Sequence, residues 1–162
     1  MSRYSLAALL CTLTVAGAAN AAVLKESNLA TADAQQLAAA TVAACQAKGY
    51  NVSAAVVDRA GLLKAFARAD NAGPHTIEAS RAKAFTSAST KAPTLAVMET
   101  AQKNPGAANL SDIPGFLLLG GGVPVKAGDS VIGAIGVAGA PGGHLDAQCA
   151  DEVLAANAAL FQ

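Results

Sequence analysis

Two histidines, His75 and His144, are the side chains of this sequence best suited to hold a metal ion. Each follows a glycine-rich stretch, Gly73-Pro74-His75 and Gly142-Gly143-His144, and each stands just before a segment with a helical pattern. A neutral imidazole is a good iron ligand and a common axial ligand of haem. The alternative for each is a polar loop residue at the start of a helix.

Five basic side chains could anchor an anionic ligand, such as a carboxylate or a haem propionate: Arg59, Arg68, Arg81, Lys83 and Lys91. Arginine pairs with a carboxylate through two parallel hydrogen bonds, whereas lysine acts as a point charge. The alternative is solvation at the surface, with pairs one helical turn apart such as Glu78 and Arg81.

Several common kinds of site are excluded by the sequence. It contains no HExxH zinc motif, no CxxCH motif for covalent haem, no phosphate-binding GxxxxGK[ST] loop and no GxSxG motif. The 11 basic and 11 acidic residues leave no positive excess for nucleic acid or anionic lipid. No conventional active site is present, and whether the protein is an enzyme stays open.

Residues 1–21 have the pattern of a secretory signal peptide. Arg3 supplies the positive charge, residues 6–17 form the apolar segment, and Ala19-Asn20-Ala21 is a cleavage site of small residues. The apolar segment is too short for a permanent membrane span. We therefore expect cleavage after Ala21 and a periplasmic or secreted protein.

The rest of the chain, residues 22–162, has the length of one domain. No lipid anchor is expected, because Leu10 precedes Cys11 where a lipidation signal requires a small residue. Apolar residues make up 53% of the sequence. Burial of this apolar surface between subunits would explain the surplus, so we expect a homo-oligomer.

Residue patterns predict an α+β domain with alternating groups of helices and strands. Segment 130–139 carries no charge on either face, which is typical of a strand covered on both sides at the centre of a sheet. Its glycines leave flat patches for a helix, a partner or a ligand. We expect helices at 31–48, 76–89, 93–103 and 146–160, and strands at 51–57, 62–68, 116–119, 123–125 and 130–139.

Several motifs together resemble the haem-binding and haem-degrading domain family of the GlcG/HbpS type. They are VVDRAG at 56–61, Arg68-x-Asp70, SRAKA at 80–84, GGVPV at 121–125 and VIGAIGVAGA at 131–140. The resemblance extends over roughly residues 29–160. The combination of the first and last motifs is fairly specific, whereas each motif alone is weak.

The resemblance implies a PAS/profilin-like fold with a five-stranded antiparallel sheet flanked by helices, and an oligomer. Together with the predicted signal peptide, the resemblance predicts an exported protein that binds haem or another tetrapyrrole, for haem scavenging, sensing or degradation. Two alternatives remain. One is a small-molecule-binding accessory subunit or enzyme with no haem role, and the other is an oligomeric interaction protein.

In folds of this type the first and last strands lie side by side and antiparallel, so the loops before both histidines meet at one end of the sheet. We call this end the rim. The resemblance favours His75 as the axial ligand, with Arg81 and Lys83 on the following helix for the propionates. His144 is the second candidate at the same site.

The same strand order places Cys45 and Cys149 at the rim, in the last turn of the first helix and the first turn of the last helix. They are the only cysteines once the signal peptide is removed, and exported proteins mature in an oxidising compartment. We therefore predict a disulfide between them. The alternative is two buried free thiols.

Overall fold

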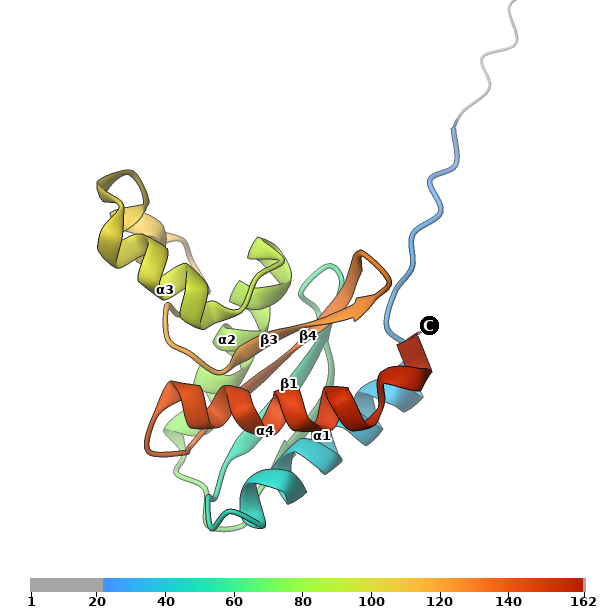
Figure 1. The fold of residues 1–162 in the computed structure, drawn as a ribbon, viewed down its shortest axis with the longest axis vertical. Helices are drawn as coiled ribbons and strands as arrows, with labels where there is room; N and C mark the ends of the chain where they lie inside the picture. The colour runs from blue at the N-terminus through green and yellow to red at the C-terminus, as the bar shows by residue number, and fades with distance from the viewer. Residues whose placement is uncertain (1–21, 162) are drawn as a thin grey trace, which may run out of the picture.

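The computed structural model describes residues 22–161, and the predicted signal peptide at 1–21 lies outside them (Figure 1). Helices and strands alternate in groups, as an α+β domain requires. The elements are α1 (Thr31–Gln46), β1 (Ser53–Asp58), β2 (Leu63–Arg68), α2 (His75–Thr90), α3 (Thr94–Lys103), η1 (Pro105–Asp112), β3 (Gly122–Ala127), β4 (Ser130–Ala138), α4 (Gly143–Ala156) and η2 (Ala158–Phe161).

The sheet is antiparallel and has the strand order β2-β1-β4-β3. As predicted, β4 is central and buried along nearly its whole length. The α+β class is confirmed, but the expectation of five strands is wrong for the described residues, which form a four-stranded sheet.

The missing strand is the segment expected at 116–119. Its backbone is bonded to side chains of neighbouring helices: the Leu117 N–H donates to Thr86 Oγ1, and the Leu119 carbonyl accepts from Thr94 Oγ1. Gly115 before it has φ +86°, a left-handed conformation outside the strand region. An apolar run such as 116–119 cannot form a strand ladder where its backbone groups already have other partners.

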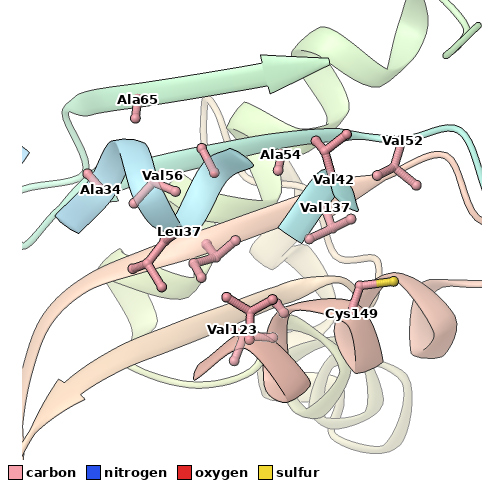
Figure 2. Packing of buried hydrophobic residues seen from close by; sticks show 14 of the residues in the cluster. Ala34, Leu37, Val42, Val52, Ala54, Val56, Ala65, Val123, Val137 and Cys149 are labelled. Carbon is pink, nitrogen blue, oxygen red and sulfur yellow. The ribbon is translucent and has the colours of Figure 1, made fainter. Parts of the chain in front are cut away.

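Helices cover both faces of the sheet. On β1, Ala54 and Val56 point into the larger core beneath α1 and α4 (Figure 2). Their neighbours Ala55 and Val57 point the other way and pack against α2. This alternation is the two-residue period of a strand, and it explains why β1 is apolar on both faces.

The glycines of β4 allow α2 to lie close to the sheet. A Cβ on Gly136 would overlap the Ser80 carbonyl oxygen and the Ala84 nitrogen. A helix, a partner and a ligand were the neighbours expected at the glycines of this strand, and at Gly136 the neighbour is a helix. Within residues 22–161, no helix is both long and apolar enough to cross a membrane.

Candidate functional site

The predicted rim is present. Ser53, at the start of β1, pairs with Arg68 at the end of β2 and with Ala138 at the end of β4. The start of α2 is attached there, because the Ser53 and Thr76 hydroxyls form a 2.7 Å hydrogen bond. The loops that carry both histidines therefore leave the sheet at one end.

Both histidines are exposed at helix starts. The His75 ring lies over Gly73, and the His144 ring lies over Gly142, each close enough that a Cβ on the glycine would contact the imidazole. However, α2 and α4 cover opposite faces of the sheet (Figure 1). The histidines share an end of the fold but begin helices on different sides of it.

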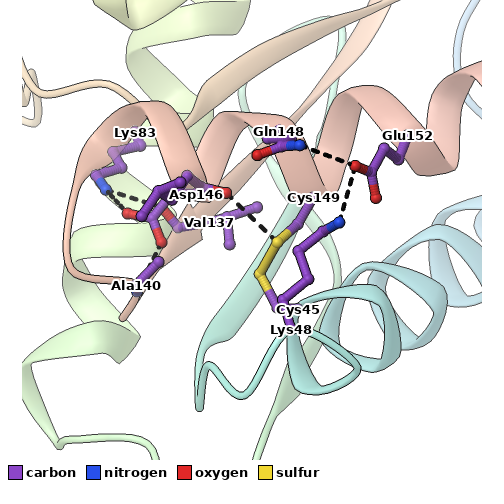
Figure 3. Close-up of a disulfide and its surroundings, with 10 residues drawn as sticks. Cys45, Lys48, Lys83, Val137, Ala140, Asp146, Gln148, Cys149 and Glu152 are labelled. Atoms are coloured by element: carbon purple, nitrogen blue, oxygen red, sulfur yellow. Dashed lines mark hydrogen bonds and ion pairs between the residues drawn. A yellow bond between two sulfur atoms is a disulfide. The ribbon is translucent and has the colours of Figure 1, made fainter.

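Lys83 is not available for a propionate, so the prediction of this residue as an anchor is wrong. Its side chain is only 1% exposed, and Nζ lies 2.8 Å from Asp146 Oδ2 and 2.8 Å from the Val137 carbonyl oxygen (Figure 3). Asp146 Oδ1 also accepts a hydrogen bond from the Ala140 N–H. Burial raises the pKa of the Asp146 carboxyl, and the hydrogen bond from Lys83 opposes that rise.

The disulfide between Cys45 and Cys149 is present, with the two Cα atoms 5.4 Å apart. It joins α1 to α4 one turn beyond Asp146 (Figure 3). Both cysteines are fully buried. The disulfide and the Lys83–Asp146 pair together attach the start of α4 to α1 and α2, which identifies both as structural.

A cavity of about 300 Å³ lies on the α2 side of the sheet, at the opposite end from the rim. Its volume is at the lower end of the range for small-molecule sites. The Phe85 ring lies against Gly61 of the β1–β2 turn and against Gly115. The lining is mostly apolar, with one charged pair: Val57, Gly61, Leu63, Glu78, Arg81, Ala82, Phe85, Pro114 and Gly115.

Arg81, a predicted anchor, does line this cavity. Its Nη1 lies 3.1 and 3.2 Å from the two carboxylate oxygens of Glu78, and its side chain is 49% exposed. His75 does not line the cavity. It nevertheless lies on the same side of α2 as the cavity. Three lining residues, Glu78, Ala82 and Phe85, follow His75 by three, seven and ten residues, and such spacings place side chains on one side of a helix.

The other basic candidates have separate positions. Arg68 donates a hydrogen bond to the Ala72 carbonyl at the rim. Arg59 lies at the turn end of the sheet, 3.4 Å from Glu26. Lys91 caps the end of α2 in a left-handed conformation. The structure therefore does not gather all five basic candidates into one anchor: Arg59 and Lys91 line one cavity at the turn end of the sheet, whereas Arg68 lies at the rim and Arg81 lines the cavity beside α2.

Sequence reasoning missed the cavity and the role of Phe85 in its wall. The available signal was indirect. Gly61 and Gly115 both have positive φ and both leave room for the same aromatic ring, but they are distant in sequence. Helical periodicity alone gives no information on which loop covers Phe85.

Comparisons with known proteins agree with the motifs. Residues 29–155 match the family model described as "Haem degrading protein HbpS-like". Protein GlcG of Escherichia coli K12 is 36% identical over 107 residues, which are 64% of this chain and 78% of GlcG.

Two solved structures have the same fold. The crystal structure of HbpS has a TM-score of 0.77 and 41% identity, covering 83% of this chain and 93% of HbpS. A crystal structure of a PduOC:heme complex has a TM-score of 0.70 and 25% identity, covering 80% of this chain and 94% of PduOC. The family model spans most of the described domain, and the chain belongs to the HbpS-like family of haem-degrading proteins.

Proposed function

We propose that this protein is an exported haem- or tetrapyrrole-binding protein whose ligand lies along the outer side of α2. The observation that carries the proposal is the largely apolar cavity beside α2, with Arg81 in its lining and His75 on the same side of the helix. Family membership and the haem complex of a structural neighbour support a haem-related function. Scavenging, sensing and degradation are three uses of such a site.

The residues present fit part of a tetrapyrrole. Val57 and Phe85 offer apolar surface to a macrocycle edge. The Arg81 guanidinium can exchange its exposed partner Glu78 for a propionate at small cost, because exposed ion pairs contribute little. His75 supplies an exposed imidazole, a common axial ligand of haem iron.

A hemin titration followed by the Soret band tests the proposal. We expect saturable binding, a Soret shift or loss in His75→Ala, and weaker binding in Arg81→Gln. His144→Ala is the matched control, since this histidine is also exposed and follows a glycine but lies on α4. An unchanged spectrum and affinity in both α2 variants would place the haem elsewhere, and absence of saturable binding would refute haem binding.

The cavity's volume supports a second candidate, a smaller ligand bound by an accessory subunit or enzyme of the same family. A cavity of this size accommodates a small molecule without the extra surface that a macrocycle needs. Retention of a small molecule by purified protein that does not bind hemin would favour this candidate. Mass spectrometry of the denatured protein would identify such a ligand.

Export and self-association complete the proposal. The tripartite pattern of residues 1–21 supports export, which an intact mass beginning at Ala22 on periplasmic or secreted protein would test. Exposed apolar side chains on β2 and the adjacent turn support a homo-oligomer: Leu62, Leu63 and Phe66.

A further inference from the structure

A second cavity, of about 270 Å³, lies at the turn end of the sheet and is predominantly polar. Three segments that are distant in sequence form it: the β1–β2 turn, the end of α2 and the β3–β4 hairpin. Its lining residues are Arg59, Lys91, Lys126, Asp129, Ser130 and Val131. It shares no lining residue with the cavity beside α2.

The cavity has an excess of positive charge. Arg59, Lys91 and Lys126 bring three cations, against the single carboxylate of Asp129. Arg59 has a partner in Glu26, at 3.4 Å, but both side chains are substantially exposed. Among residues 22–161, neither lysine forms an ion pair with a carboxylate. Like charges in one hollow repel, so an anion placed between them is stabilised.

Local hydrogen bonds hold the segments that carry these cations. The Arg59 N–H donates to Asn28 Oδ1, and the turn that follows is closed by Asp58 Oδ1, which accepts from the Ala60 and Leu62 N–H groups. Lys91 has φ +56° at the end of α2, a position where glycine is the usual residue. A lysine therefore occupies a position where the backbone favours glycine, and this lysine lines the cavity.

We propose that this cavity binds a small oxyanion, a phosphate or carboxylate group. Arg59 can offer its guanidinium fork, Lys91 and Lys126 act as point charges, and the Ser130 hydroxyl can donate a hydrogen bond. The Asp129 carboxylate repels an anion, so it opposes highly charged ligands. The proposal goes beyond haem binding and does not depend on it.

Phosphate titration of isotopically labelled protein, at constant ionic strength balanced with chloride, tests the site. We expect saturable chemical-shift changes in the amide signals of Arg59, Ser130 and Val131, and none around His75. A parallel titration with malonate distinguishes the two ligand groups by which anion saturates at lower concentration. Shifts that do not saturate, or that are spread over all surface lysines, would overturn the proposal.

Charge variants sharpen the test. Lys91→Gly and Lys126→Gln should each weaken anion binding about fivefold, the scale of a partly exposed ion pair, whereas Asp129→Asn should strengthen it by a similar factor. Lys91→Gly suits the left-handed backbone and should fold well. Lys103→Gln is the control, because its side chain is 76% exposed on α3. Equal weakening in the control, or no weakening in either cavity variant, would refute a specific site.

Discussion

Lys83 and Asp146 form the most buried charged contact in residues 22–161, with side chains 1% and 4% exposed. Neither residue's role follows from sequence spacing, because Lys83 lies on the polar side of a predicted helix and looks like a surface anchor. The structure instead turns it toward the end of β4, where Val137 and Asp146 satisfy it. A buried cation needs such partners, since an unpaired one is strongly destabilising.

Removing the Lys83 cation alone should therefore lower the free energy of unfolding much more than replacing both Lys83 and Asp146. We expect Lys83→Met to lower the free energy of unfolding by about 3–5 kcal/mol, because it leaves the Asp146 carboxylate buried without a counter-charge. The double variant Lys83→Met with Asp146→Asn should recover much of this loss, since the amide oxygen can still accept from the Ala140 N–H. Urea unfolding measures both, and equal stability of the two variants would contradict the assignment.

The pH dependence has a definite sign. Burial raises the pKa of Asp146 above its ordinary value, so the folded state holds this proton more tightly than the unfolded state. The stability from protonated Asp146 is present at low pH and is lost as the pH rises through its raised pKa. In Lys83→Met the opposing cation is gone, so stability should fall more steeply with rising pH than in the double variant. Parallel pH profiles would count against this explanation.

At the scale of the elements, sequence patterns predicted two kinds correctly: helices, whose backbone hydrogen bonds are local, and a strand whose side chains are buried on both faces of the sheet. The range expected for the first helix, 31–48, contains α1, and the uncharged pattern of β4 correctly placed it at the sheet centre. The prediction of a strand at 116–119 is wrong, because the backbone of this segment forms hydrogen bonds with the Thr86 and Thr94 hydroxyls. Side-chain partners from distant helices leave no periodic signal in the sequence.

The α4 start shows the same limitation. The residue pattern predicts a last helix at 146–160, whereas α4 begins at Gly143. Asp146 lies within the first turn and reaches back to the Ala140 N–H, besides pairing with Lys83. A capping residue and a buried ion-pair partner have the same sequence signature, an acidic residue near a helix start.

At the link between α1 and α4, the disulfide should contribute strongly to stability. Its cysteines are 104 residues apart, and cross-linking a loop of that length stabilises by up to about 4.7 kcal/mol in the chain-entropy model. We expect reduction, or Cys45→Ala with Cys149→Ala, to lower the free energy of unfolding by about 2–5 kcal/mol. Urea unfolding with and without reductant measures this, and the double variant should not respond to reductant. Two free thiols in unreduced protein would exclude the bond.

At the scale of the whole molecule, the four-stranded sheet leaves β2 as an edge strand. Leu62 is 66% exposed, Leu63 46% and Phe66 38%, so apolar side chains lie along this edge and its turn. Exposed edges with apolar side chains are sites where chains associate. We therefore expect this edge to be covered by a second copy of the chain.

Light scattering during size-exclusion chromatography should give a mass that is a multiple of one chain at micromolar concentration. A stable interface buries about 1,200–2,000 Å² in total, more than one side chain can provide, so a single substitution should only weaken it. Leu62→Lys with Phe66→Lys should shift the protein toward the monomer, because burying two added charges at an interface is costly. Leu119→Lys is the matched control, since Leu119 is 45% exposed but precedes β3 at the other edge of the sheet. A monomeric wild-type protein would refute self-association, and an oligomer unaffected by the β2 variant would place the interface on another face.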